Sequence, residues 1–271
     1  MPTASRGDRS IHYEVGGEGS PVILIPGLGA GSRLFGTLPR RFERAGFRCA
    51  TPDPVGVPPS SPHVGDYDLD EAARDIWAVA DNLGIDQLNL VGTSMGGKVA
   101  LCAATLAPER VQRVVLVASS VVVTERGRRV SRVFEIVARR LEQTELAEVM
   151  ATFLFGHSFH RERPEMVNSI IRSMKFDSPT RDLMIAQARA VHTFDGTSRA
   201  ANLPCPCLCL AGSEDTLTDT AAVRATAELM PNGQYEEIRG AGHTLLLESG
   251  IVFDRVTEFL EGGPRPRTET G

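Results

Sequence analysis

Residues 92–96 read GTSMG, a serine in the G-x-S-x-G spacing, and this stretch decides the fold. The segment Gln87–Val91 before it is expected to form a strand, and Gly96–Leu106 behind it predicts a helix that stops before Pro108. A serine at such a strand–turn–helix joint lies on a tight turn that lifts its hydroxyl above the sheet. Ser94 is therefore a candidate nucleophile, and the alternative is an incidental serine in a glycine-rich turn.

Further strands and helices alternate around this unit. Alternating apolar residues predict an edge strand at Ser10–Val15. Further strands are expected at Pro21–Pro26, Phe47–Thr51, Val111–Ala118, Cys205–Ala211 and Gln234–Ile238. A helix is expected from Asp68, as N-cap with Glu71 as capping-box partner, to Gly84, and others are expected at Thr220–Met230 and near Ile251–Leu260. This alternation predicts a parallel sheet with helices on both faces.

The pattern changes between about Val121 and Asn202, where no convincing strand is found. Helical spacing appears instead at Val133–Met150, Pro164–Met174 and Thr180–Val191. The block follows a strand whose end should lie at the ligand-binding edge of the sheet. We therefore expect a helical lid at residues 121–202 over a core of residues 1–120 and 203–261, with a purely structural insertion as the alternative. Residues 262–271 are expected to form a disordered tail.

Composition excludes several classes of protein. With 42% hydrophobic and 23% charged positions, the 271 residues suit a globular domain rather than a disordered or fibrous chain. The net charge of −5, from 29 basic and 34 acidic side chains, argues against a nucleic-acid partner. No apolar run approaches the roughly 20 residues that span a bilayer, and the N-terminus lacks an apolar signal region, so we expect a cytoplasmic protein with no membrane contact.

The five cysteines form no disulfide framework. Cys205, Cys207 and Cys209 would share one face of a strand. A metal site is one interpretation, but zinc ligands are usually spaced two to four residues apart. Small buried apolar side chains are the interpretation we prefer, so no metal and no cofactor are expected.

One histidine and one carboxylate stand where a serine nucleophile needs them. His243 lies in GAGHT at residues 240–244, between the last strand and the last helix, and its imidazole can accept and return the serine proton. Asp215 follows the strand Cys205–Ala211, and Glu214 and Asp219 are its rivals as the acid behind the imidazole. No carboxylate directly follows the strand Val111–Ala118, so the other obvious position for this acid is not occupied by one. The predicted chain order is serine, aspartate, histidine.

An oxyanion needs two donors. The backbone N–H of Met95, at the start of the helix behind Ser94, is one candidate. The loop PGLG at residues 26–29 allows a close backbone approach, and we assign the N–H of Leu28 as the second.

These segments together resemble the α/β-hydrolase superfamily. The resemblance rests on IPGLG at 25–29, GTSMGG at 92–97, Gly212 to Asp215 and GAGH at 240–243, and it covers nearly the whole chain. It implies a mostly parallel eight-stranded sheet flanked by helices, with a helical lid after strand 6. Within the superfamily the chain is similar to small esterases, 3-oxoadipate enol-lactonase-like hydrolases and cofactor-free haloperoxidase-like hydrolases. The chain departs from the family pattern at Pro26, where a histidine is usual, and at Pro58, where a glycine is usual.

The resemblance implies a serine hydrolase that cleaves an ester or lactone of a small, largely apolar substrate through an acyl-enzyme. C–C bond hydrolysis, acyl transfer and a non-catalytic ligand-binding role are the alternatives, and a homodimer is left open. Apolar lid residues are expected to line the acyl pocket, among them Phe153, Phe155, Met174 and Met184. Basic residues of the same block are candidates to neutralise a substrate carboxylate, namely Arg172, Lys175 and Arg181.

Overall fold

The computed structural model describes residues 2–263, and its centre is one eight-stranded sheet. The strands lie in the order β1-β2-β4-β3-β5-β6-β7-β8. Their bounds are Thr3–Arg6 (β1), Arg9–Gly16 (β2), Ser20–Ile25 (β3), Phe47–Pro52 (β4), Leu88–Thr93 (β5), Val111–Val117 (β6), Cys207–Gly212 (β7) and Gly233–Ile238 (β8). β2 runs antiparallel to β1 and β4, and every other neighbouring pair is parallel.

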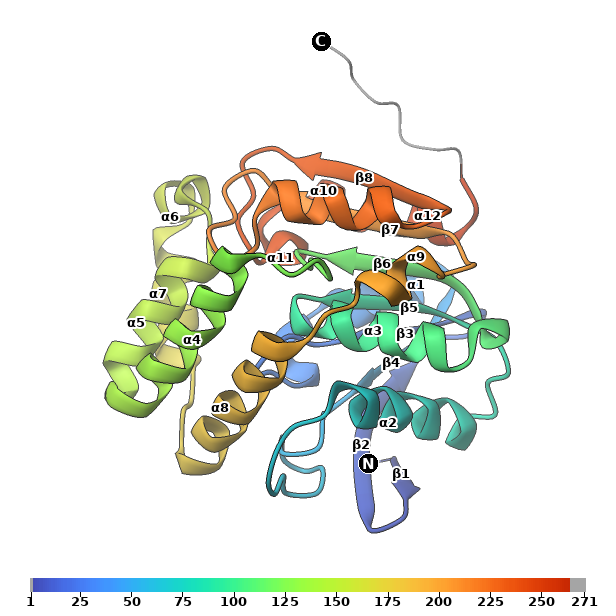
Figure 1. The fold of residues 1–271 in the computed structure, drawn as a ribbon, viewed down its shortest axis with the longest axis horizontal. Helices are drawn as coiled ribbons and strands as arrows, with labels where there is room; N and C mark the ends of the chain where they lie inside the picture. Colours follow the sequence, from blue (N-terminus) through green and yellow to red (C-terminus); the bar gives the residue numbers. More distant parts are fainter. Residues whose placement is uncertain (1, 264–271) are drawn as a thin grey trace.

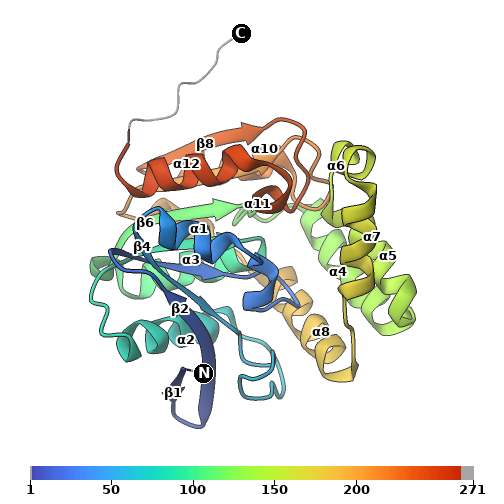
Figure 2. The same cartoon turned by 180° about the vertical axis from the view of Figure 1, so that it is seen from behind.

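Helices cover both faces of this sheet. Figure 1 shows α2, α3 and α10 in front of the strands, and Figure 2 shows α1 and α12 on the opposite face. The helices are Leu38–Arg44 (α1), Leu69–Asn82 (α2), Met95–Leu106 (α3), Glu125–Arg140 (α4), Gln143–Leu154 (α5), His157–Glu162 (α6), Pro164–Ser173 (α7), Ser178–Thr193 (α8), Thr197–Ala201 (α9), Thr220–Leu229 (α10), Leu245–Glu248 (α11) and Gly250–Leu260 (α12). This is the α/β-hydrolase architecture that the sequence predicted.

Successive side chains of the central strands pack alternately into two hydrophobic cores, one on each face of the sheet. On β6, Val114 and Leu116 pack towards α2, α3 and α10, whereas Val115 and Val117 pack towards α1 and α12. Cys205, Cys207 and Cys209 all lie in the first of these cores, and all five cysteines are buried and free. Within residues 2–263 no group of three or more metal-ligating side chains is found. Burial raises the pKa of the Cys205 thiol to about 11, as expected for an apolar packing residue.

Helices α4 to α9 are inserted between β6 and β7. Figure 1 shows α4, α5, α6 and α7 beyond the arrowheads of β6 and β8, at the carboxyl end of the parallel strands. α4 and α8 lie side by side and pack on one another. The insertion therefore lies at the edge of the sheet where parallel α/β proteins bind ligands. No helix among the described residues is long and apolar enough to cross a membrane.

Several local predictions differ from the structure. The predicted edge strand at Ser10–Val15 is not at the edge, because the short strand β1 pairs with its outer side. The pattern over Val133–Met150 contains a break between α4 and α5, where Glu142 caps α5 and exchanges hydrogen bonds with Glu145. Of the tail predicted at residues 262–271, positions 264–271 lie outside the described residues.

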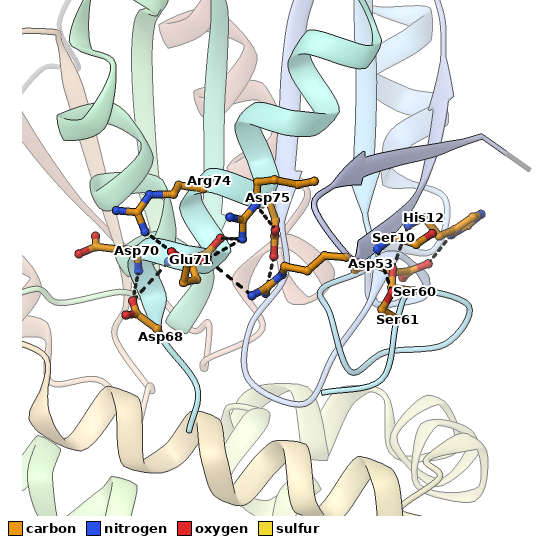
Figure 3. A network of polar contacts seen from close by, with 12 residues as sticks. Ser10, His12, Asp53, Ser60, Ser61, Asp68, Asp70, Glu71, Arg74 and Asp75 are labelled. Atoms are coloured by element: carbon orange, nitrogen blue, oxygen red, sulfur yellow. Dashed lines mark hydrogen bonds and ion pairs between the residues drawn. The ribbon is translucent and has the colours of Figure 1, made fainter. Parts of the chain in front are cut away.

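The cap of α2 is partly as predicted. The Asp68 side chain accepts hydrogen bonds from the backbone N–H groups of Asp70 and Glu71. The side chain of Glu71 does not complete a capping box, because it forms ion pairs with Arg6 (2.8 Å) and Arg74. Figure 3 shows this carboxylate between Arg74 and the buried Asp75. The contacts tie β1 to α2.

Candidate active site

The backbone of Ser94 has the strained geometry of a nucleophile elbow. Ser94 lies between β5 and α3 with φ 54° and ψ −120°. Among the described residues, only one other non-glycine residue, Ala118, has a positive φ. Such a conformation costs roughly 1–3 kcal/mol and persists where surrounding contacts enforce it. Here the Ser94 N–H donates to the carbonyl of Val117 at the end of the neighbouring strand β6 (2.8 Å).

The two glycines of the motif are required by close packing. A Cβ atom on Gly92 would lie 2.3 Å from the carbonyl oxygen of Gly96. A Cβ atom on Gly96 would lie 2.2 Å from the carbonyl oxygen of Ile25 on β3. Both distances are far shorter than a van der Waals contact. The neighbouring atoms belong to the backbone, so they cannot move aside. The elbow therefore depends on glycine at both positions, as the spacing of the motif predicted.

His243 and Asp215 form a buried pair. His243 Nδ1 lies 2.8 Å from Asp215 Oδ2. The other carboxylate oxygen accepts hydrogen bonds from the N–H groups of Leu217 (2.8 Å) and Thr218 (2.9 Å). The Asp215 side chain is 1% exposed, so all of its contacts are shielded from water. An imidazole that donates from Nδ1 to a carboxylate keeps Nε2 as an acceptor, which is the form a general base needs.

The rival carboxylates have other partners. Glu214 accepts hydrogen bonds from the N–H (2.8 Å) and hydroxyl (2.7 Å) of Ser158, at the start of α6. Asp219 caps α10 by accepting from the N–H of Ala221 (3.0 Å). Among these three acids, only Asp215 contacts His243.

Ser94 and His243 line the same cavity, beneath α4 and α8. Its volume is about 210 Å³, and Leu28 and Met95 also line it. The remaining apolar wall comes mainly from the insertion and the loops beside it, including Val122, Val130, Phe134, Met150, Leu154, Val191, Phe194 and Leu217. A cavity of this size and character suits a small, largely apolar molecule.

The two predicted oxyanion donors are free to bind a ligand. Within residues 2–263 neither the Leu28 nor the Met95 backbone N–H has a hydrogen-bond partner. The loop that carries Leu28 is held on both sides. Gly29 N–H donates to the side-chain oxygen of Gln187 on α8 (2.7 Å), and Ser32 N–H donates to Asp53 Oδ1 (2.6 Å). These contacts preorganise the loop, as an oxyanion hole requires.

His12 supports the same loop from a distance. His12 is 5% exposed, and its Nδ1 lies 2.6 Å from Asp53 Oδ2. Figure 3 shows this pair with Ser60, whose hydroxyl accepts from the His12 N–H and donates to the Asp53 carbonyl. Neither Gln187 nor His12 lies in a sequence motif, so these supporting roles could not be predicted from the sequence.

The predicted substrate contacts lie outside the cavity. None of Phe153, Phe155, Met174 and Met184 lines it. Phe155 stacks on Phe159 with ring centroids 5.3 Å apart, and Phe153 is at the surface. Met174 and Met184 pack with the helices of the insertion. The insertion needs a core of its own, and Phe155, Met174 and Met184 form part of it.

The basic residues singled out in the sequence also lie elsewhere. Arg181 donates to the backbone carbonyls of Phe176, Ala138 and Leu141, which is a structural role. Arg172 and Lys175 are exposed and do not line the cavity. The cations that do line it are Lys98, Arg126 and Arg128.

Glu248 fixes the loop that carries His243. One carboxylate oxygen accepts from the N–H groups of Gly242 (2.8 Å) and Gly156 (3.0 Å). The other accepts from the N–H (3.1 Å) and hydroxyl (2.6 Å) of Thr244. The carboxylate thereby binds the residues on both sides of His243 and joins them to the insertion.

Replacing Glu248 with glutamine is therefore expected to lower the turnover of an ester substrate about tenfold, because an amide NH2 would face backbone donors. Steady-state kinetics would show the loss mainly in kcat, since the orientation of His243 is what changes. Glu261→Gln, at an exposed position, is the matched control. An unchanged kcat for Glu248→Gln would refute this role.

Comparisons with known proteins agree with this fold. Residues 20–250 match the family model described as alpha/beta hydrolase fold. The 2-hydroxy-6-oxo-6-phenylhexa-2,4-dienoate hydrolase of Burkholderia cepacia is 27% identical, over 93% of this chain and 92% of that protein. A thermophilic esterase from Thermogutta terrifontis is 25% identical with a TM-score of 0.83, covering 96% of this chain and 97% of the other. The enol-lactonase of Burkholderia xenovorans has a TM-score of 0.86 at 22% identity, over 96% and 100% of the two chains. The chain belongs to the alpha/beta hydrolase fold family.

Proposed function

We propose that the protein is a serine hydrolase that cleaves an ester or lactone of a small carbonyl substrate. The observation that carries the proposal is the buried His243–Asp215 pair, which lies at the carboxyl end of the sheet and shares its cavity with a serine in elbow geometry. The similarity to the Thermogutta terrifontis esterase and the Burkholderia xenovorans enol-lactonase supports this class of substrate.

In the first half of the reaction, Ser94 Oγ attacks the substrate carbonyl while His243 Nε2 takes the hydroxyl proton. The carbonyl oxygen becomes an oxyanion, which accepts hydrogen bonds from the N–H groups of Leu28 and Met95. Asp215 stabilises the imidazolium that has formed. The C–O bond to the leaving group then breaks, and His243 returns the proton to the departing oxygen.

In the second half, water attacks the acyl-enzyme. His243 accepts one proton of that water, the tetrahedral intermediate forms again at the same donors, and the C–O bond to Ser94 breaks. The proton returns to Ser94 Oγ, and the products are the free acid and the alcohol. A lactone follows the same steps and yields one hydroxy acid.

A panel of p-nitrophenyl esters and simple lactones tests this proposal. We expect saturable, enzyme-dependent hydrolysis with short and medium acyl chains preferred, because the cavity is modest in volume. Release of p-nitrophenol and titration of the acid product are the two readouts. No turnover of any ester or lactone by folded protein would contradict the proposal.

C–C bond hydrolysis is the second candidate. It is favoured by the similarity to the Burkholderia cepacia dienoate hydrolase, because a 2-hydroxy-6-oxo-dienoate has a ketone and no ester bond to hydrolyse. Decay of the visible absorbance of a meta-cleavage product distinguishes the two. Turnover of that compound with higher kcat/KM than any ester would replace ester hydrolysis as the proposed reaction.

A further inference from the structure

The cavity contains a lysine that the proposed mechanism does not use. Lys98 lies on α3, one helical turn after Ser94, and lines the same cavity. Four residues of helix separate the two by about 6 Å along the axis. Its ammonium group donates to the carbonyl of Ser120 and lies 5.4 Å from the ring centroid of Phe194.

No carboxylate within the described residues lies in ion-pair distance of Lys98. An ammonium group has three N–H donors, and the Ser120 carbonyl accepts from it, so donor capacity is left over. A cation in a largely apolar cavity without a counter-charge is costly, and proteins rarely keep one without a use. Burial accordingly lowers the pKa of Lys98 to about 8.

Most of the other charged and titratable groups that line the cavity are also basic. Arg126 and Arg128 line the cavity from α4, and His192 lines it from α8. Asp219, the one carboxylate among the lining residues that the structure describes, caps α10. On α3 itself, Cys102 lies one turn further on, and burial raises the pKa of its thiol to about 12. The cavity is therefore cationic, although the chain as a whole carries a net charge of −5.

We propose that Lys98 forms an anion-binding subsite and that the preferred substrate is an ester or lactone whose acyl part ends in a carboxylate. The inference rests on the proposed function, because Ser94 would attack the carbonyl while Lys98 holds the carboxylate in the same cavity. A bound carboxylate supplies the missing counter-charge and accepts a charge-assisted hydrogen bond. Lys98 then selects among esters by their charge.

The test compares two esters of the same chain length, p-nitrophenyl hexanoate and p-nitrophenyl hydrogen adipate. In the natural protein, kcat/KM for the adipate ester should exceed that for the hexanoate. Lys98→Met should lower this ratio roughly tenfold or more, mainly through KM for the adipate ester, because it removes one charge-assisted hydrogen bond. Lys175→Met, the same change at an exposed lysine outside the cavity, should keep the natural ratio.

The pH dependence gives a second measurement that needs no variant. Because the pKa of Lys98 is lowered to about 8, the amine is charged below that pH and neutral above it. The preference for the adipate ester should therefore be complete at neutral pH and decline as the pH rises through about 8. A ratio that stays constant across this range, or that survives Lys98→Met, would overturn the proposal.

A binding measurement separates this proposal from the proposed function. Calorimetric titration of the Ser94→Ala protein with adipate and with hexanoate requires no turnover. Tighter binding of adipate, lost in the Ser94→Ala/Lys98→Met double variant, supports the anion subsite even if the natural protein hydrolyses no ester. Ester turnover combined with equal binding of the two acids refutes the subsite and leaves the proposed function intact.

Discussion

Ser94→Ala is expected to reduce the turnover of p-nitrophenyl butyrate by roughly a thousandfold or more. Alanine has no oxygen to attack the carbonyl, so no acyl-enzyme can form and the two-step route is lost. The oxyanion donors would stay in place, because both are backbone N–H groups, and a small residual rate is expected from them. His243→Ala should produce a loss of similar size, since residues that act as one unit fail together.

The measurement is steady-state kinetics on purified variants whose folding is checked by circular dichroism. Ser173→Ala is the control, because that serine lies exposed at the end of α7, where its hydroxyl donates to the carbonyl of Ile170 (2.7 Å). It should retain the natural rate. Ser94→Ala protein that keeps more than a tenth of the natural kcat would refute the role of Ser94.

Asp215→Asn should lower kcat by roughly a hundredfold to ten-thousandfold while changing KM little. The asparagine oxygen can still accept from Leu217 and Thr218, which leaves its NH2 group facing His243 Nδ1. The imidazole must then accept at Nδ1 and carry its proton on Nε2. That tautomer cannot take the serine proton, so the defect is electronic rather than structural.

Glu214→Gln is the matched control for Asp215→Asn, one residue earlier in the chain. Glu214 contacts Ser158 at the start of α6 and not His243, so its amide should cost less than tenfold in kcat. The two variants thus separate the acid that orients the imidazole from the acid that holds the insertion. Equal losses in both variants would contradict the assignment of Asp215.

The sequence predicted the parts of the fold that repeat a strong pattern. The apolar run Val114–Val117 of β6 is typical of a buried strand, and the backbone packed against Gly92 and Gly96 excludes any larger residue at these two positions of GTSMG. β1 escaped prediction because Thr3–Arg6 has only four residues and one buried side chain. The break between α4 and α5 also escaped, because it contains no glycine or proline and its cap is a glutamate.

The residues of the insertion that line the cavity could not be predicted from the sequence. Apolar residues of the insertion pack either on the substrate cavity or on one another, and residue type alone does not distinguish the two. Phe155 stacks within the insertion, whereas its neighbour Leu154 lines the cavity. Lys98 was overlooked because it follows the motif on a helix whose other residues are mostly buried. Only the three-dimensional arrangement shows which face of α3 meets the cavity.

The most direct test of the central claim is labelling with a fluorophosphonate probe followed by peptide mass spectrometry. An activated serine attacks phosphorus and expels fluoride, so we predict one adduct, on the peptide that contains Ser94. His243→Ala should abolish the labelling, because the hydroxyl then has no base. An unlabelled natural protein, or an adduct on another residue, would contradict the account.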